Sequence, residues 1–171
     1  MDTDFLLIQK MRNGDEAALE TFVRQYYSPI LKYCMLHTAD KSTAEDLTQE
    51  TFERFFKSFG DYRHCGKAAN YLYSIAANIC RDQLRRASPP LSLEEAPEPG
   101  YDSSERLDER ISVFSELDRL PDELRETATL YFTHELKQKD IARILDIGLP
   151  LVKYRIKRAR EILSARLREE E

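Results

Sequence analysis

Residues 136–160 hold the pattern that most constrains the fold, two short amphipathic segments separated by a break. The first segment has the apolar spacing of a helix, with one face formed by Ile141, Ala142, Ile144 and Leu145. Residues 146–148 interrupt that period, and Pro150 suits the first turn of a second helix, where its missing N–H costs nothing. The stretch therefore predicts a helix-turn-helix.

The second segment has an apolar face and a basic face. Its inward positions recur at helical spacing at Val152, Ile156, Ala159 and Leu163. The other side carries cationic and aromatic side chains, namely Lys153, Tyr154, Arg155, Lys157, Arg158 and Arg160. Docking in the major groove of DNA requires such a helix, because cations neutralise phosphates while other side chains reach base edges. An ordinary helical hairpin with a solvated basic face is the alternative that this stretch leaves open.

The composition indicates a soluble, mostly helical protein. Of 171 residues, 42% are hydrophobic and 33% are charged, and there are only five glycines. No run of about 20 apolar residues and no secretion leader occurs, so we expect a cytoplasmic protein. The cysteines Cys34, Cys65 and Cys80 lack metal-site spacing and are expected to be reduced thiols. We therefore expect no metal and no cofactor.

The charge is unevenly distributed. The net charge of −5 argues against nucleic acid as a partner, but residues 87–120 alone carry nine acidic and three basic residues. Residues 121–171 carry eleven basic and ten acidic residues, with the positive charge concentrated on one helix. The acidic total therefore does not exclude DNA binding.

The first part of the chain predicts helices with recognisable caps. Asp4 and Asp15 are placed to cap the first two helices, and Pro29 predicts a kink or a break in the second. Ser42 and Glu45 have the spacing of a capping box that opens the third.

One side of the third helix is acidic and polar. The residues that share it at i, i+3, i+4 and i+7 are Asp46, Gln49, Glu50 and Glu53. A solvated surface is the simpler interpretation. A metal-dependent enzyme is rejected, because no second set of Glu and His residues completes a carboxylate cage.

A loop over residues 60–67 precedes a fourth helix, expected over about 69–86. The predicted inward positions of this fourth helix are Leu72, Ile75, Ala76, Ile79 and Leu84. Outward polar positions and interleaved aromatic residues comprise Asn78, Arg81, Arg85, Arg86, Tyr62, Tyr71 and Tyr73. Cations and aromatic rings together suit single-stranded DNA. The alternative is that the arginines complement the helix dipole and the tyrosines belong to the core.

Proline and acidic residues then separate two domains. We expect an all-α protein with one domain over 1–86, a flexible acidic linker over 87–103 and a second domain over 104–171. The second domain is predicted to begin with a helix over 104–120, and Pro121 opens the next one.

Several segments in this order resemble the bacterial extracytoplasmic-function (ECF) sigma factors, small members of the primary sigma family. Residues 44–52 (AEDLTQETF) look like the region-two signature, and residues 71–78 (YLYSIAAN) with 82–86 (DQLRR) look like the promoter-melting helix. Three further segments resemble region four of the family: residues 120–125 (LPDELR), 140–145 (DIARIL) and 152–160 (VKYRIKRAR).

The resemblance implies a transcription initiation subunit with no catalytic site of its own. Core RNA polymerase would be bound, at the clamp helices of its largest subunit, by Asp46, Gln49, Glu50 and Glu53. The minus-ten element, with one base flipped into loop 60–67, would be contacted by Tyr62, Arg63, His64, Lys67, Tyr71, Asn78, Arg81, Arg85 and Arg86. In the minus-thirty-five element, base edges would be read by Lys153, Tyr154 and Lys157, and phosphates bound by Arg155, Arg158 and Arg160.

The resemblance also implies other partners and reveals departures from the family pattern. Region four would contact the flap of the second-largest polymerase subunit, and an anti-sigma factor is expected. Tyr71 stands where many members have tryptophan, Ala77 replaces a frequent arginine and Asp146 a frequent turn glycine. Pro150 and Leu151 replace the usual small and hydroxyl residues. An autonomous helix-turn-helix repressor and a helical enzyme are the rival classes, the enzyme being disfavoured because no catalytic constellation is present.

Overall fold

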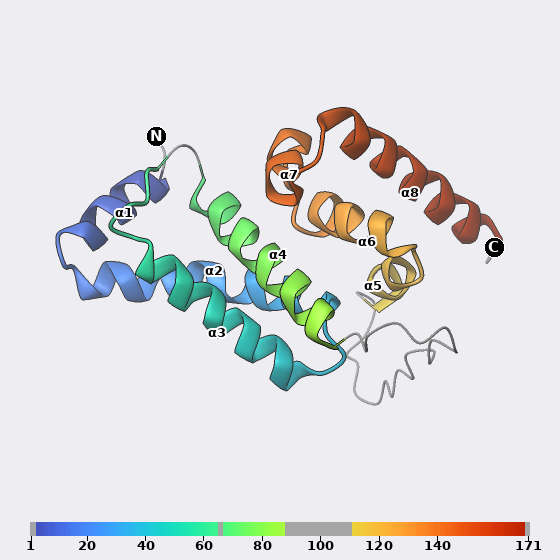
Figure 1. The fold of residues 1–171 in the computed structure, drawn as a ribbon. Coiled ribbons are helices and arrows are strands. Elements are labelled where there is room, and N and C mark those ends of the chain that lie inside the picture. Colours follow the sequence, from blue (N-terminus) through green and yellow to red (C-terminus); the bar gives the residue numbers. More distant parts are fainter. Residues whose placement is uncertain (1–2, 65–66, 88–110, 170–171) are drawn as a thin grey trace. The chain divides into compact units, whose positions relative to one another are not determined.

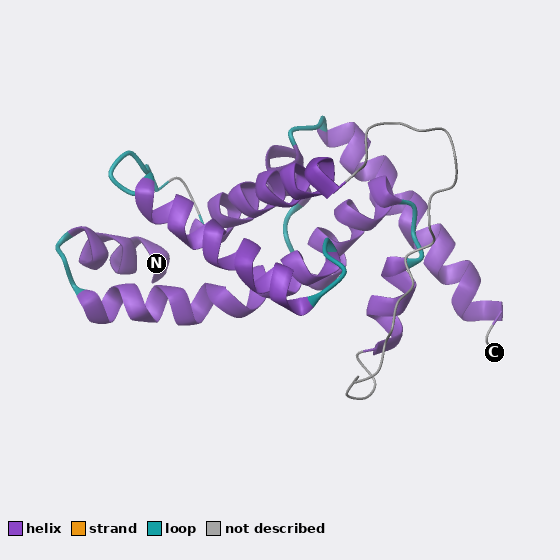
Figure 2. Ribbon diagram, turned by 60° about the horizontal axis from the view of Figure 1, so that its bottom comes forward, coloured by secondary structure: helices purple, strands orange, loops and turns teal. Residues whose placement is uncertain are grey.

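The structure is a computed structural model that describes residues 3–64, 67–87 and 111–169. Those residues form helices joined by loops and include no strand (Figures 1 and 2), so the predicted all-helical fold class is confirmed. The chain divides into two compact units, Met1–Pro99 and Gly100–Glu171. Residues 88–103 of the predicted linker lie outside the described part of the chain, and the linker boundaries stay a prediction.

Unit 1 contains α1 (Thr3–Arg12), α2 (Glu16–Leu36), α3 (Lys41–Lys57) and α4 (Ala68–Ala87). Helix α3 packs against both α2 and α4, and α1 packs on α2 (Figure 1). The turn between α1 and α2 places Gly14 at a φ of 82°, a conformation that glycine adopts without a steric penalty. The Asp15 carboxylate accepts a hydrogen bond from the Ala18 N–H at 3.1 Å, so its predicted role as the cap of α2 is confirmed.

The core of unit 1 is rich in aromatic rings. Phe22 of α2 and Phe55 of α3 are fully buried, with stacked rings whose centroids lie 5.0 Å apart. Leu72 of α4 and Ile30 of α2 are fully buried in the same unit. Burying a side chain of this size stabilises the fold by about 1.5–3 kcal/mol, so these contacts hold the helices that carry the polar surfaces described below.

Several local predictions for unit 1 differ from the structure. Helix α3 begins at Lys41 and not at a Ser42 capping box, because the Asp40 carboxylate accepts from the Thr43 N–H at 2.8 Å and caps it two residues earlier. Helix α2 continues through Pro29, so the predicted alternative of a break is wrong, whereas a kink at Pro29 stays a prediction. Leu84 is 50% exposed although the helical period places it on the inward face, so the described part of unit 1 leaves the last turn of α4 uncovered.

Unit 2 contains α5 (Ile111–Asp118), α6 (Asp122–Ala128), a π-helical turn η1 (Thr129–Thr133), α7 (Gln138–Leu145) and α8 (Leu149–Glu169). Pro121 immediately precedes α6, as predicted, whereas residues 104–110 of the expected preceding helix lie outside the described residues. One hydrophobic cluster in the core of unit 2 consists of Leu117, Leu120, Leu124, Ala128 and Ala159.

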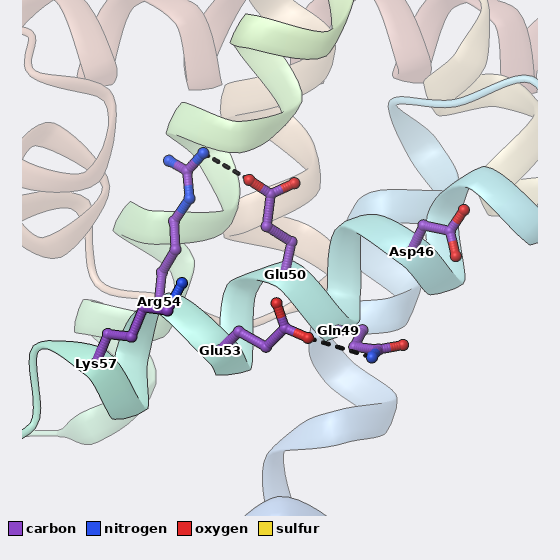
Figure 3. A pocket seen from close by; sticks show the side chains of 6 residues that line it. All are labelled: Asp46, Gln49, Glu50, Glu53, Arg54 and Lys57. Atoms are coloured by element: carbon purple, nitrogen blue, oxygen red, sulfur yellow. Dashed lines mark hydrogen bonds and ion pairs between the residues drawn. The ribbon is translucent and has the colours of Figure 1, made fainter.

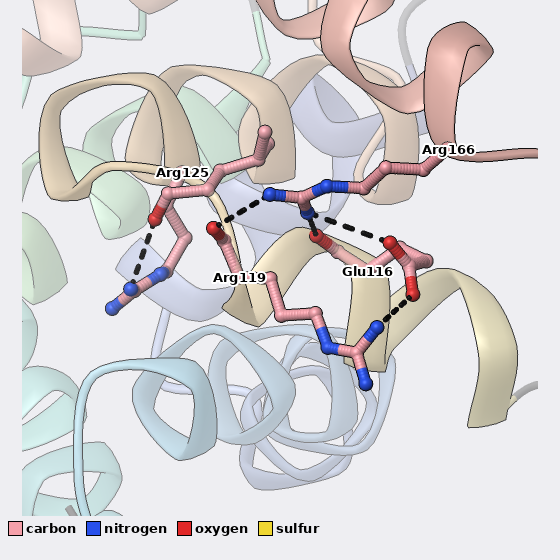
Figure 4. Close-up of polar contacts among 5 residues, drawn as sticks. Glu116, Arg119, Arg125 and Arg166 are labelled. Carbon is pink, nitrogen blue, oxygen red and sulfur yellow. Dashed lines mark hydrogen bonds and ion pairs between the residues drawn. The ribbon is translucent and has the colours of Figure 1, made fainter. Parts of the chain in front are cut away.

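Polar contacts join the end of α8 to α5. The Arg166 guanidinium donates to the Glu116 carboxylate at 3.4 Å and to the Arg119 carbonyl at 3.2 Å (Figure 4). Arg119 in turn donates to the other oxygen of the Glu116 carboxylate at 2.9 Å. Glu116 is buried, so these two cations keep its charge paired. The C-terminal part of α8 is thereby fixed, and its N-terminal part is positioned by α7.

Candidate functional site

A shallow polar surface on α3 gathers the four predicted acidic and amide side chains. Asp46, Gln49, Glu50 and Glu53 line one hollow together with Arg54 and Lys57 (Figure 3). Gln49 donates to the Glu53 carboxylate at 3.2 Å, and Arg54 pairs with Glu50 at 2.5 Å. We call these six residues the α3 surface.

Arg54 and Lys57 lie on this surface in addition to the four predicted residues. Their signal was present, because each follows an acidic residue, Glu50 or Glu53, by one helical turn. The α3 surface is consequently acidic toward its N-terminal end and basic toward its C-terminal end. Within this surface Glu50 is paired with a cation and Glu53 accepts from an amide, and the Asp46 and Glu53 side chains are exposed.

One of the predicted DNA-binding tyrosines of loop 60–67 is enclosed by its neighbours. Tyr62 is only 8% exposed, and its ring stacks on Tyr71 with centroids 5.0 Å apart. The Tyr62 hydroxyl lies 3.0 Å from His64 Nδ1, and the Tyr71 hydroxyl lies 3.0 Å from Ser58 Oγ. The two rings therefore form a wall behind the loop and do not project from it.

The remaining loop positions are more accessible. Arg63 and Lys67 are exposed and His64 is half-buried, whereas Cys65 and Gly66 lie outside the described residues. Tyr73 of α4 belongs to the core, where its ring meets Tyr33 edge-on at 5.7 Å. The structure thus places cationic side chains at the surface and two of the three interleaved tyrosines inside.

The outward side of α4 continues with polar residues. Arg81 donates to the Asn78 side-chain carbonyl at 2.9 Å and to the Ala77 carbonyl at 3.2 Å, so one contact holds both predicted residues in place. Arg85 and Arg86 are exposed in the last turn. Arg81, Arg85 and Arg86 thus give the C-terminal half of α4 three guanidinium groups.

The predicted helix-turn-helix is present in α7 and α8. Asp146 ends α7 in the left-handed conformation, with φ 53° and ψ 48°. The next N–H, of Ile147, donates to the Ala142 carbonyl at 3.0 Å, which satisfies an otherwise unpaired group at the helix end. Val152, Ile156 and Ala159 of α8 are buried as predicted, so the basic side faces solvent.

The six predicted DNA-contacting residues of α8 differ in accessibility. Tyr154 is 61% exposed, and Lys153, Lys157, Arg158 and Arg160 are also exposed. The Arg160 guanidinium lies over the Phe132 ring at 5.8 Å from its centroid. Only 15% of the Arg155 side chain is exposed, and its guanidinium pairs with Glu123 of α6 at 3.7 Å. The sequence reasoning missed the Glu123 contact because it joins residues of different helices.

Neither a cluster of metal ligands nor a membrane-spanning helix occurs among the residues that the structure describes. Within residues 3–64, 67–87 and 111–169, no three His, Cys, Asp or Glu side chains gather as metal ligands. None of the described helices is long and apolar enough to cross a membrane.

The sequence matches two profiles of one family. Residues 22–89 match sigma-70 region 2, and residues 111–163 match sigma-70 region 4. The chain is 29% identical to the ECF RNA polymerase sigma factor SigW of Bacillus subtilis, with 95% of each protein aligned. It is also 29% identical to the RNA polymerase sigma-H factor of Pseudomonas aeruginosa, over 97% of this chain and 94% of that protein.

Solved structures show the same fold. CnrH, in complex with the cytosolic domain of CnrY, has a TM-score of 0.73 at 21% identity, covering 99% of this chain and 100% of that one. The sigma factor RpoE of Bartonella quintana, in complex with the anti-sigma factor NepR, has a TM-score of 0.69 at 18% identity, covering 90% of this chain and 98% of that one.

A region-2 helical unit followed by a region-4 helix-turn-helix defines a protein of the sigma-70 class, and the two matched segments together make up more than half of the chain. Within that class the near full-length alignments identify the subgroup. The chain belongs to the ECF sigma factors.

Proposed function

We propose that this ECF sigma factor binds core RNA polymerase, directs it to specific promoters and assists in opening them. The observation that carries this function is the presence, on one chain and in family order, of region 2 and region 4. An initiation subunit needs both, because it must hold a promoter at two elements while attached to the enzyme that performs the chemistry.

The α3 surface is the proposed docking site for the polymerase. Asp46 and Glu53 present exposed carboxylates, and Gln49 beside them offers an amide. These groups would pair with the basic clamp helices of the largest subunit. The Arg54–Glu50 ion pair lies at the surface and stabilises the fold by at most about 1 kcal/mol, so it could break and let Glu50 pair with a polymerase cation. If the pair stays intact, it would form an uncharged border of the contact.

The loop before α4 and the outward side of α4 are the proposed minus-ten site. Arg63, His64 and Lys67 would contact the non-template strand, and Asn78, Arg81, Arg85 and Arg86 would bind its backbone or the duplex just upstream. The stacked rings of Tyr62 and Tyr71 support a base pocket from behind. A flipped base would then meet an aromatic wall already held by the core.

The exposed side of α8 is the proposed reader of the minus-thirty-five element. Lys153, Tyr154 and Lys157 would reach base edges, and Arg155, Arg158 and Arg160 would bind phosphates. Arg155 would have to leave Glu123 to do so, which makes Arg158 and Arg160 the readier phosphate ligands. Region 4 would also contact the flap of the second-largest subunit.

An anti-sigma factor is the further proposed partner. Its support is family membership together with the fold shared with RpoE, a sigma factor solved in complex with the anti-sigma factor NepR. A cytoplasmic location follows from a partner such as core polymerase and belongs to the same proposal.

Run-off transcription with core polymerase and genomic template tests the function. Promoter-specific transcripts are expected from the wild type and should vanish when Asp46 and Glu50 are both changed to Lys. The charge-matched control changes Glu16 and Glu20 of α2 to Lys, two residues outside the α3 surface, and should retain transcription. Specific duplex binding without polymerase, combined with no transcription, would instead identify an autonomous repressor.

A further inference from the structure

Two thiols face each other in the core of unit 1, and nothing in the proposed promoter or polymerase contacts uses them. Cys34 of α2 and Cys80 of α4 are 0% and 2% exposed. The Cys80 thiol donates toward the Cys34 sulfur, with 4.0 Å between the two Sγ atoms. Helices α2 and α4 pack side by side (Figure 1), so both sulfurs sit at a helix-helix contact and not in a loop.

Neighbouring groups favour the thiolate of Cys34. The Cys80 thiol lowers the pKa of Cys34, burial opposes this by raising it, and Thr48 lowers it further. Thr48 of α3 is itself fully buried and donates to the Ala44 carbonyl at 2.7 Å. We therefore assign Cys34 as the attacking thiol, with the Cys80 sulfur 4.0 Å away in reach to resolve what it forms.

We propose that Cys34 and Cys80 are a disulfide-forming pair that covalently joins α2 to α4 when the protein meets hydrogen peroxide. The gap between the sulfurs exceeds a disulfide bond length by about 2 Å, a distance that rotation of the two side chains and small helix shifts can close. The modification goes beyond the transcription function, and its test needs neither polymerase nor promoter.

The reaction balances in two steps. The Cys34 thiolate attacks one peroxide oxygen and breaks the O–O bond; the second oxygen leaves as water after taking a proton, and Cys34 becomes a sulfenic acid. The Cys80 sulfur then attacks the sulfenic sulfur, and the hydroxyl leaves as a second water with the Cys80 proton. Two electrons pass from the sulfurs to the peroxide, two thiols are lost and one S–S bond forms.

Burial of the two thiols slows their oxidation, and the disulfide, once formed, should stabilise unit 1. Because both sulfurs are shielded, peroxide reaches them only during local opening of the α2–α4 contact, so oxidation should be slower than that of an exposed thiol. Once formed, the bond closes a loop between residues 46 apart in the sequence. A cross-link across such a loop restricts the unfolded chain and should raise the unfolding temperature of unit 1.

Peptide mapping of the full-length protein tests the pair directly. Trypsin separates the three cysteines into peptides 33–41, 64–67 and 68–81. The reduced protein is treated with hydrogen peroxide in the presence of a chelator, quenched with catalase, alkylated after denaturation and digested without reductant. We expect a linked 33–41/68–81 pair, lighter than the two free peptides by two hydrogen atoms, in the wild type and equally in Cys65→Ser.

Single variants and unfolding supply the second readout. Cys34→Ala and Cys80→Ala should each abolish the linked pair, and peroxide should raise the unfolding midpoint of the wild type by about 5 °C or more but that of neither variant. Dithiothreitol should reverse the rise. The proposal is overturned if Cys34 and Cys80 are both fully alkylated after peroxide treatment. It is also overturned if either of them is linked to Cys65 and no Cys34–Cys80 link forms. Both outcomes hold whatever the stability of the variants.

Discussion

The Asp4 carboxylate in α1 accepts a hydrogen bond from the Ala68 N–H, the first residue of α4, 64 residues further along the chain, at 3.2 Å. The same carboxylate accepts from the Tyr26 hydroxyl of α2 at 2.6 Å. Near the other end of α1, Arg12 donates to the Tyr62 carbonyl, and its guanidinium lies 5.9 Å from the centroid of the Phe59 ring. Helix α1 therefore braces both ends of the loop proposed to hold the minus-ten strand.

Replacing Asp4 should destabilise unit 1. Asp4→Ala leaves the buried Tyr26 hydroxyl and Ala68 N–H without this acceptor, which costs about 1–3 kcal/mol in the free energy of unfolding measured by urea titration. Tyr26→Phe removes one donor but leaves the cap on α4 and should cost only about 1 kcal/mol. Equal losses in the two variants would mean that the Ala68 contact contributes nothing.

The Asp4 contact shows which features the sequence could and could not reveal. Asp4 was expected to cap its own helix, because local pattern relates a residue only to its near neighbours; its bond to Ala68 depends on how α1 and α4 meet in the fold. The four acidic and amide residues of the α3 surface were predictable, because helical spacing alone places Asp46 and Glu50 on one side. Arg155 lies between these two cases: helical spacing predicts that it points outward, but it does not predict the ion pair with Glu123 of another helix.

Asp40, and not Ser42, should control the start of α3. Its carboxylate accepts from the Thr43 N–H at 2.8 Å and the Thr43 hydroxyl at 2.7 Å, and the backbone contact to Thr43, followed by the side-chain contact, lowers the pKa of Asp40. Asp40→Ala should lower the unfolding temperature at pH 7, whereas Ser42→Ala should leave it nearly unchanged.

The pH dependence of that difference has a definite sign. The pKa of Asp40 is lower in the folded state than its ordinary value of 3.8, so the ionised carboxylate stabilises the fold at every pH above that value. The stabilisation is lost as the pH falls through the folded-state pKa. The gap in unfolding temperature between the wild type and Asp40→Ala should therefore be constant near neutrality and narrow below about pH 4. A gap that widens in acid would contradict the cap.

Glycine at position 146 should stabilise unit 2. Asp146 adopts a φ of 53°, where a Cβ is strained and glycine is not. Asp146→Gly should raise the free energy of unfolding by up to about 1 kcal/mol, measured by denaturant titration. Arg143→Gly, at an exposed position inside α7, is the matched control and should lose about 1 kcal/mol. A loss in both variants would show that the Asp146 side chain outweighs the backbone strain.

Replacing Arg155 should mainly lower stability, whereas replacing Arg158 should mainly weaken DNA binding. The Arg155 side chain is largely covered and paired with Glu123, so Arg155→Ala should cost about 1 kcal/mol of stability without DNA present. The Arg158 side chain is 55% exposed, with its surface partner Glu161 at 3.1 Å, and its loss should leave stability within about 0.5 kcal/mol. Arg158→Ala holoenzyme should instead bind every promoter more weakly, with the salt slope reduced by about one.

Lys153 and Tyr154 should change promoter choice where Arg158 changes only affinity. Both are exposed in the first two turns of α8, where the recognition helix of a helix-turn-helix meets base edges. Lys153→Ala and Tyr154→Ala holoenzymes, compared on a library of minus-thirty-five sequences, should each relax discrimination at particular base pairs, by about 1–3 kcal/mol per lost contact. Arg158→Ala is the control for a uniform loss. If all three variants weaken every promoter in the library equally, Lys153 and Tyr154 bind the DNA backbone and the base-reading residues lie elsewhere on α8.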